Sequence, residues 1–131
     1  MKKLLFLPLV LISCLCFGQF ETSDITAEEI IGKPVKIGNL FVAKYDFPNT
    51  MDWNDAKNAC RALGKGWRLP TKNELNLLYK NKEKIGGSKV GIYWSSTDYA
   101  TDGAWVMSFY NGWQDFAKKT EKYYVRAIRA F

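Results

Sequence analysis

The 131-residue sequence contains no histidine, and this absence narrows the chemistry that the chain supports. Histidine titrates near neutral pH, so it serves widely as a general base and as a transition-metal ligand. Only three cysteines are present, which is too few for the disulfide framework that holds many small secreted domains together. We therefore expect a protein that is not an enzyme, binds no metal and carries no cofactor.

Long hydrophobic runs are also scarce, and the one that occurs lies at the N-terminus. Lys2 and Lys3 precede an apolar run over residues 4–17. This run is shorter than the about 20 residues that a membrane-spanning helix needs. A positively charged N-terminal region followed by a short apolar run is typical of a secretory signal peptide. We therefore expect residues 1–18 to be a signal peptide and the protein to be exported, with a periplasmic, extracellular or outer-membrane-anchored location.

Two ways of processing this segment remain open. Cys16 and Gly18 are small residues suitably spaced for signal-peptide cleavage, which would leave Gln19 as the first residue. Alternatively, residues 11–14 (Leu-Ile-Ser-Cys) resemble the lipobox of a bacterial lipoprotein, in which Cys14 would carry a lipid. Lipidation at Cys14 is the only attachment to a membrane that we expect.

The mature chain has the size of one domain. Loss of Lys2 and Lys3 reduces the 19 basic residues to 17 against 13 acidic ones, so the net charge falls from +6 to +4. Residues 19–33 are polar and acidic and are expected to form an N-terminal arm, followed by a folded domain over residues 34–131. An aromatic content of 15% excludes a chain that is disordered throughout.

The spacing of apolar residues predicts a helix from about Asp52 to Leu63. Asp52 suits the N-cap position, where its carboxylate accepts a backbone N–H. One face of this helix carries the apolar residues Trp53, Ala56, Cys60 and Leu63. Cys60 is therefore interpreted as a small buried hydrophobe, with a reactive or intermolecular thiol as the alternative.

A second helix is predicted from Thr71 to about Lys82, because Thr71 and Glu74 have the spacing of a capping box. Alternating and β-branched segments predict strands at residues 35–37, 40–47, 92–97, 104–110, 113–117 and 123–131. Asn111-Gly112 is a strong hairpin signal between two of these strands. The order of helices and strands predicts an α+β fold.

Several motifs occur together in the order of one bacterial domain family. Residues 53–60 resemble the W-x-x-A-x-x-x-C signature in the first helix of C-type-lectin-like folds. Residues 66–75 (G-W-R-L-P-T-K-N-E-L), 93–97 and 125–129 look like a domain family of unknown function. This family is similar to the C-terminal domain of the collagen-like adhesin Lcl and is related in fold to the formylglycine-generating enzymes. The resemblance implies a C-type-lectin-like α+β fold, in which two helices flank a twisted antiparallel β-sheet.

The resemblance does not extend to the functional groups of the relatives. Formylglycine-generating enzymes use a pair of active-site cysteines, whereas only Cys60 lies in the folded domain here, on a helix. Iron-dependent relatives use histidine ligands, which this chain lacks. Calcium-dependent lectins carry a Trp-Asn-Asp motif on a late strand, but the Trp-Asn-Asp at residues 53–55 opens a helix. Since fold alone does not imply activity, an enzyme on this fold is the less favoured alternative.

Two polar motifs are interpreted as structural. Ser95, Ser96 and Thr97 would need a neighbouring base to act as nucleophiles, and no histidine is available. Arg68 is expected to bond a carboxylate such as Glu74 rather than an external ligand.

Positive charge is concentrated between residues 57 and 89. Nine lysines and arginines stand against two acids, Glu74 and Glu83, so this segment alone carries +7. It suggests a patch for an anionic partner, such as a sulfated glycan, an anionic envelope polymer or acidic lipid headgroups. The predicted patch residues are Lys57, Arg61, Lys65, Lys80 and Lys84. The alternative is that they are the solvated faces of two helices, and nucleic acid is not expected to meet an exported protein.

Two aromatic residues lie outside the family motifs. Trp113 follows a turn and Tyr99 lies in a loop, where an exposed ring can stack on a sugar. Polar side chains beside them would bond the sugar hydroxyls. The predicted binding loops, around residues 99–103 and 113–115, supply Tyr99, Asp102, Trp113, Gln114 and Asp115. The alternative is that Trp113 packs beneath the hairpin.

Together these patterns favour an exported, non-catalytic ligand-binding module whose ligand is a carbohydrate or an anionic surface polymer. A structural subunit of a cell-envelope complex, with an envelope protein as its partner, is the second interpretation.

Overall fold

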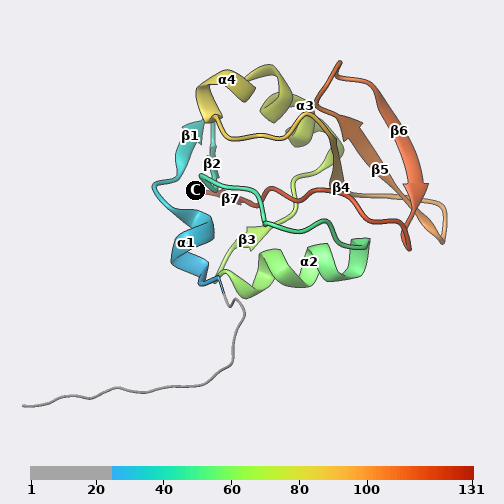
Figure 1. Ribbon diagram of the computed structural model, residues 1–131, viewed down its shortest axis with the longest axis horizontal. Coiled ribbons are helices and arrows are strands. Elements are labelled where there is room, and N and C mark those ends of the chain that lie inside the picture. Colours follow the sequence, from blue (N-terminus) through green and yellow to red (C-terminus); the bar gives the residue numbers. More distant parts are fainter. Residues whose placement is uncertain (1–24) are drawn as a thin grey trace, which may run out of the picture.

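The computed structural model describes residues 25–131 (Figure 1). Four helices and seven strands occur in this part of the chain: α1 (Ala27–Ile31), β1 (Val35–Ile37), β2 (Leu40–Val42), α2 (Trp53–Ala62), β3 (Trp67–Arg68), α3 (Lys72–Lys80), α4 (Lys82–Ile85), β4 (Ile92–Tyr99), β5 (Gly103–Ser108), β6 (Gln114–Lys118) and β7 (Ile128–Ala130). The predicted signal peptide, the cleavage and lipidation sites and the first part of the predicted arm lie outside the described residues.

The strands form two antiparallel sheets. The first has the order β1-β2-β7-β3, so the C-terminal strand lies between two strands from the first half of the chain. The second, β4-β5-β6, is a meander on the side of the domain away from α1 (Figure 1). A hydrogen bond from the Trp94 N–H to the Tyr124 carbonyl, at 3.1 Å, connects the second sheet to the segment before β7. The predicted C-type-lectin-like α+β fold is confirmed, with two sheets in place of one.

The two long helices begin where their capping residues predict. Asp52 accepts the Asp55 N–H at 2.9 Å at the start of α2. At α3, Thr71 and Glu74 accept each other's backbone N–H groups, which completes the capping box. In Figure 1, α2 lies along one side of the domain, and α3 and α4 lie along the opposite side. Strands β3 and β7 of the first sheet therefore lie between the helices, and the second sheet closes one end of the domain (Figure 1).

Short elements differ from the predictions. α1 occupies the end of the segment expected to be an arm, and its Ile30 is only 3% exposed. The short helix α4 was not predicted, and β2 and β7 are shorter than the strands expected at residues 40–47 and 123–131. A helix of one turn has too few residues to show an apolar period, so the sequence carries little signal for it.

The predicted hairpin forms with a longer turn than a two-residue type. Ser108 donates its N–H to the Trp113 carbonyl at 2.8 Å, and Gly112 donates to the Ser108 carbonyl at the same distance. The turn therefore spans residues 109–112, and Gly112 takes a φ of +81°, where glycine is favoured. Phe109 is buried within this turn, so the loop is tied to the core.

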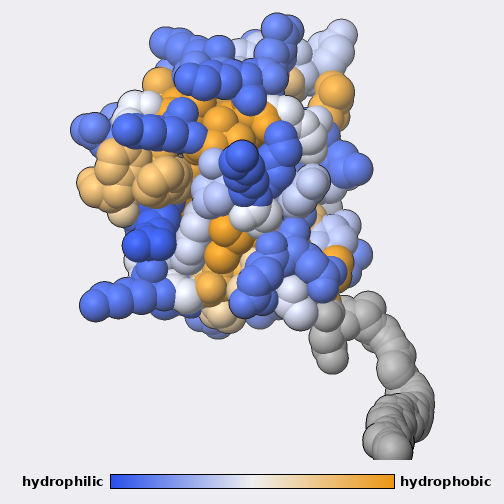
Figure 2. Space-filling view, turned by 90° about the vertical axis from the view of Figure 1, so that its left-hand side faces the viewer, coloured by the Kyte–Doolittle hydropathy of each residue, from blue (hydrophilic) through white to orange (hydrophobic). Residues whose placement is uncertain are grey.

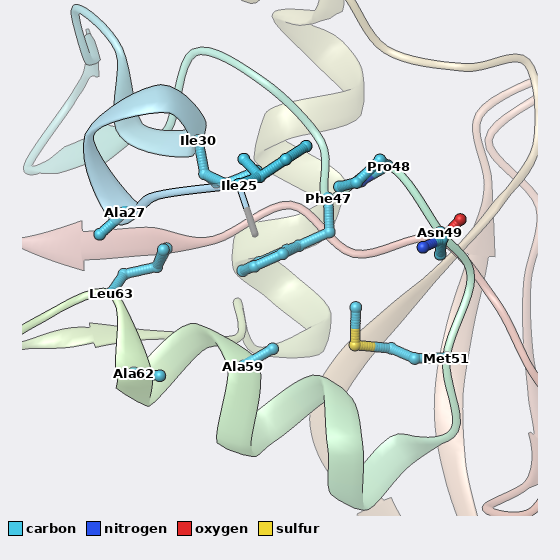
Figure 3. A pocket seen from close by; sticks show the side chains of 10 residues that line it. All are labelled: Ile25, Ala27, Ile30, Phe47, Pro48, Asn49, Met51, Ala59, Ala62 and Leu63. Atoms are coloured by element: carbon cyan, nitrogen blue, oxygen red, sulfur yellow. The ribbon is translucent and has the colours of Figure 1, made fainter. Parts of the chain in front are cut away.

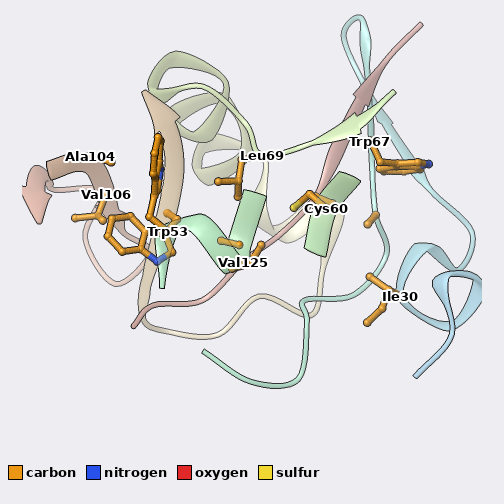
Figure 4. Close-up of a cluster of buried hydrophobic side chains, with 12 residues drawn as sticks. Ile30, Trp53, Cys60, Trp67, Leu69, Ala104, Val106 and Val125 are labelled. Carbon is orange, nitrogen blue, oxygen red and sulfur yellow. The ribbon is translucent and has the colours of Figure 1, made fainter. Parts of the chain in front are cut away.

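Two apolar clusters form the core. The first, shown in Figure 4, joins α2 to the second sheet and contains Trp53, Cys60, Leu69, Val106 and Val125. The second lies beneath α3 and contains Leu75, Leu78, Tyr93, Met107 and Ile128. Cys60 is fully buried, and burial raises the pKa of its thiol to about 12. Its position on the buried face of the helix is as predicted, and a thiol in this environment stays protonated and unreactive.

One ion pair is buried in the core. Arg126 Nε donates to Asp46 Oδ1 at 2.6 Å, and its remaining guanidinium nitrogens donate to the carbonyls of Ala43 and Gly86. The Tyr93 hydroxyl donates to the other oxygen of Asp46. Burial is the main cause that raises the pKa of Tyr93 above its usual value, and Asp46 adds to it. The network ties three separate loops together.

The surface formed by α1, β1 and β2 is mixed in character (Figure 2). Hydrophobic residues emerge there in separate areas between long hydrophilic side chains. Phe131, which is exposed, packs its ring against Phe41 with 4.5 Å between centroids, and the Lys36 ammonium lies 4.8 Å from the Phe131 ring centre. These contacts attach the C-terminus to β1 and β2.

Candidate functional site

The five residues predicted to bind a ligand are divided between both faces and both ends of the second sheet. Tyr99 pairs with Gly103 at one end of β5, whereas Trp113 follows the turn at the other end, opposite Ser108. Side chains alternate between the faces of a strand, so Trp113 and Asp115 point to one face and Gln114 to the other. The structure therefore does not bring the two predicted loops together into one site.

The face that carries Tyr99 is an aromatic cluster. The rings of Tyr99 and Phe116 stack 3.9 Å apart with 10° between their planes, and Trp105 meets Phe116 edge-on. The Lys72 ammonium lies 3.5 Å from the centre of the Trp105 ring. Gln114 donates its amide to the Lys72 carbonyl at 3.3 Å, so its side chain bonds α3. Gln114 thus has a structural contact on this face.

Trp113 and Asp115 line a groove on the opposite face, which we call the Trp113 groove. Its volume is about 280 Å³, and its other lining residues are Ile92, Val106, Phe116, Ala117, Lys118, Glu121 and Tyr123. Trp113 is 55% exposed, so the alternative of packing beneath the hairpin does not describe it. Glu121 and Tyr123 also line this groove but were not predicted as site residues. Glu121 lies in a polar turn and Tyr123 directly follows it, and the sequence there has no pattern that indicates a binding site.

Asp102 lies apart from the other predicted ligand residues. It is exposed in the loop between β4 and β5, and its carbonyl accepts the Lys119 N–H at 2.8 Å. In the same region, the Lys119 ammonium pairs with Asp98 at 2.6 Å. Of the five predicted residues, only Trp113 and Asp115 share a groove.

The predicted basic patch is also divided. Lys57, Arg61 and Lys65 lie on α2 or just after it, whereas Lys80 and Lys84 lie on α3 and α4, at the opposite side of the domain (Figure 1). One continuous surface over all five is therefore not formed. The sequence placed them together because they are close along the chain, but the chain between α2 and α3 crosses the domain through the core residues Trp67 and Leu69.

Around α2, three cations border one small pocket, and we call Lys57, Arg61 and Arg68 the α2 cation cluster. The pocket has a volume of about 170 Å³ and is also lined by Leu69 and Ser96. Lys57 places its ammonium 3.9 Å from the centre of the Trp53 ring, which fixes its position. Arg68 was predicted to be structural and is the member that the predicted patch lacked.

Arg68 is partly neutralised within the protein. Its two terminal nitrogens donate to the two oxygens of Glu74 at 2.7 and 3.0 Å, as predicted for a structural arginine. The hydrogen bond from Arg68 is the main cause that holds the pKa of Glu74 below its usual value. The same bond raises the pKa of Arg68. The uncompensated charge of the cluster therefore comes from Lys57 and Arg61.

Two of the three hydroxyl side chains at residues 95–97, those of Ser95 and Thr97, are structural. Ser95 is buried and donates its hydroxyl to the Trp105 carbonyl at 2.7 Å. Thr97 Oγ1 accepts the Lys72 N–H at 2.8 Å, which adds a second cap to the start of α3. These contacts occupy both side chains with the backbone of neighbouring elements.

A further groove lies between α1, α2 and the loop before α2 (Figure 3). It has a volume of about 370 Å³ and is lined by Ile25, Ala27, Ile30, Phe47, Pro48, Asn49, Met51, Ala59, Ala62 and Leu63. In Figure 3, Phe47 and Met51 point from the loop into the space above α2, which Ala59 of α2 and Leu63, just after α2, also border. No residue of this groove was predicted to belong to a site, because apolar residues in a sequence are ordinarily assigned to the buried core.

Residues 25–131 contain neither a metal-binding cluster of side chains nor a membrane-spanning helix. No cluster of three or more His, Cys, Asp or Glu side chains in this range could hold a metal ion. None of the helices in the range is long and apolar enough to cross a membrane.

Comparison with known proteins supports both the family and the fold. A family model described as "Lcl C-terminal domain" matches residues 32–129. Comparison with curated proteins found no match. Among solved structures, the domain is similar to two C-type-lectin-like snake venom proteins, EMS16 and botrocetin.

The two structural similarities have nearly the same extent. EMS16, described as an antagonist of the collagen receptor integrin α2β1, shares 14% identity with a TM-score of 0.57, covering 75% of this chain and 97% of its own. Botrocetin shares 13% identity with a TM-score of 0.58, covering 76% of this chain and 98% of its own. At such low identity the similarity establishes the fold alone.

Proposed function

Since the chain belongs to the Lcl C-terminal domain family, we propose that it is an exported, non-catalytic binding module for an anionic carbohydrate or another anionic surface polymer. The observation that carries this proposal is the α2 cation cluster. Its three positive side chains border one pocket, which Ser96 also lines.

The pocket has the chemistry of an anion site. A sulfate, phosphate or carboxylate group seated between Lys57 and Arg61 would accept charge-assisted hydrogen bonds, which are stronger than neutral ones. A recessed position lowers the local screening by water and so strengthens the attraction. Ser96 supplies a neutral donor beside the cations. Single contacts of this kind are weak at a surface, so a polymer that repeats the anionic group suits the site better than a free ion.

The fold is compatible with binding rather than catalysis. EMS16 is described as a receptor antagonist, so a domain of this architecture can act through a binding surface. That comparison is an analogy of fold and adds nothing about the ligand of this chain. An enzyme on the same fold would need a nucleophile with a base beside it, and the Ser95 hydroxyl is instead bonded to the Trp105 carbonyl.

A structural subunit of an envelope complex is the second candidate. The aromatic cluster favours it, because Tyr99 and Phe116 are both exposed on one face of the second sheet. Aromatic side chains of this kind are enriched at protein interfaces. Replacement of both by serine should abolish recovery of a partner protein after cross-linking in cells, whereas anion binding should remain unchanged. Unchanged recovery would remove this candidate.

Retention of the mature protein on immobilised heparin tests the proposed function. The wild type should elute only as salt is raised, because salt screens the attraction between exposed charges. A double variant, Lys57→Ala with Arg61→Ala, should elute at clearly lower salt. The matched control is Lys80→Ala with Lys84→Ala, which removes the same charge from the opposite side of the domain. Equal loss in both variants would show that net charge alone governs retention and would contradict the proposal.

A further inference from the structure

We propose that the Trp113 groove is a second binding site, which takes a pyranose unit that carries no acidic group. It lies on the second sheet, and its lining residues are different from those of the α2 cation cluster. The inference therefore goes beyond the anion-binding function and does not depend on it.

The backbone of Trp113 is held within the hairpin turn. The backbone N–H of Trp113 donates to the Asn111 side chain at 3.0 Å, and the Trp113 carbonyl accepts the Ser108 N–H at 2.8 Å. Both bonds belong to a hairpin turn whose Phe109 is buried in the core. A large, exposed ring carried on such a turn costs little backbone entropy on binding, because the turn is already ordered.

Tyr123 is a second aromatic residue of the lining, and its contacts hold it in place. Its ring meets Trp94 of the core edge-on, with 5.1 Å between centroids, and its backbone is bridged to Met51. Its hydroxyl donates to Glu121 Oε1. Burial is the main cause that raises the pKa of Tyr123 to about 12, and Glu121 adds to it, so the hydroxyl keeps its proton. The groove is thus lined by two aromatic residues whose position is set by the surrounding fold, Trp113 and Tyr123.

Two carboxylates supply the polar groups. Asp115 accepts the Phe116 N–H through Oδ1, and Glu121 accepts the Tyr123 hydroxyl through Oε1. The second oxygen of each is outside the hydrogen bonds formed within residues 25–131, so it can accept a ligand hydroxyl. Apolar Ile92, Val106 and Ala117 complete the lining. A pyranose matches this set, because its C–H face suits an aromatic ring and its hydroxyls donate to carboxylates.

The charge of the groove selects against acidic sugars. An anionic group in a groove lined by the carboxylates of Asp115 and Glu121 would be repelled, whereas a neutral or amine-bearing ring would not. Lys118 also borders the groove, but alternation along β6 directs its side chain to the opposite face from Asp115. At about 280 Å³, the groove is near the lower end of small-molecule sites, about 300–1,000 Å³, and suits one ring better than a long segment.

The test is a titration followed by NMR of the tryptophan indole N–H signals. The probes are cello-oligosaccharides, chitosan oligosaccharides and oligogalacturonate, which are neutral, amine-bearing and acidic. We expect the Trp113 signal to shift with a neutral or amine-bearing probe and not with the acidic one. Trp113→Ala should weaken binding of that probe by about tenfold or more, as for a central aromatic contact.

Matched variants separate this site from general effects. Tyr110→Ala removes another exposed aromatic residue from the same turn, and Asp102→Asn removes an exposed carboxylate outside the groove; neither should change binding. Asp115→Asn should weaken it, and Lys57→Ala with Arg61→Ala should leave it intact even if heparin retention is lost. Absence of any shift with all three probes, a preference for the acidic probe, or binding unaffected by Trp113→Ala would overturn the proposal.

Discussion

Arg68 and Glu74 face each other with both nitrogens of the guanidinium end bonded to both oxygens of the carboxylate, at 2.7 and 3.0 Å. Glu74 also accepts the Thr71 N–H, so one carboxylate caps α3 and holds the arginine that borders the α2 pocket. The start of α3 and the cation cluster are thereby coupled through a single side chain.

Glu74→Gln should destabilise the domain and at the same time increase anion binding. The variant weakens the capping box and removes the ion pair, at a cost of about 1–2 kcal/mol, while the positive charge of Arg68 is no longer compensated by a carboxylate. Thermal or urea unfolding measures the first effect, and the salt needed for elution from heparin measures the second. A variant that unfolds more easily but elutes at lower salt would contradict the coupling.

The Glu74 contribution should depend on pH in one direction. Its pKa is lowered in the folded state, so its stabilising effect is present above the ordinary glutamate pKa of 4.5 and is lost as pH falls through the lower folded value. The difference in unfolding free energy between the wild type and Glu74→Gln should therefore be constant near neutral pH and shrink below about pH 4.5. A difference that grows on acidification would contradict this assignment.

Cys60 should be inert in the folded protein. Its thiol is fully buried and has a pKa of about 12, so almost no thiolate exists at neutral pH. A thiol reagent such as DTNB should react with Cys60 only after denaturation. The protein used should begin at Gln19, so that Cys14 and Cys16 are absent and Cys60 is the only cysteine that can react. Rapid reaction under native conditions would contradict the burial.

Arg126→Met should be among the most destabilising single substitutions. Arg126 and Asp46 are 2% and 5% exposed at their side chains, so the variant leaves a carboxylate buried without its cation. Loss of one partner of a buried pair costs about 3–5 kcal/mol. Urea unfolding should show a drop of this order, whereas Arg129→Met, which removes an exposed arginine from β7, should change stability by less than about 1 kcal/mol.

Ile30→Ala tests whether α1 belongs to the folded domain. Ile30 is 3% exposed and packs in the first core cluster, and it also lines the groove of Figure 3. Truncation of a buried isoleucine costs about 2–5 kcal/mol. Glu28→Ala, an exposed change on the same helix, is the control. Equal stability of the two variants would indicate that the segment before Pro34 is an arm, as the sequence suggested.

Local patterns predicted the parts of the fold that depend on local physics. The Asp52 N-cap, the Thr71–Glu74 capping box and the buried face with Cys60 follow from the spacing of a few neighbouring residues, and all three are present. The family motifs predicted the architecture, which the family match and the structural similarities confirm.

The candidate sites were harder to predict, because they depend on where side chains lie after the strands pair. Tyr99 and Trp113 are only a short hairpin apart in sequence, yet alternation and the length of β5 put them on opposite faces and at opposite ends. Likewise, the lysines of α2 and α4 are close in sequence and lie on opposite sides of the domain (Figure 1). A cluster of basic residues along the sequence therefore did not predict a single basic patch on the surface.

The salt dependence of binding to a heparin oligosaccharide, measured by isothermal titration calorimetry, tests the central claim most directly. If the α2 cation cluster binds anionic polymer, Lys57→Ala with Arg61→Ala should lower affinity by about tenfold and flatten the salt dependence. The Lys80→Ala with Lys84→Ala control should behave like the wild type. Wild-type affinity and salt dependence in the α2 variant would contradict the account.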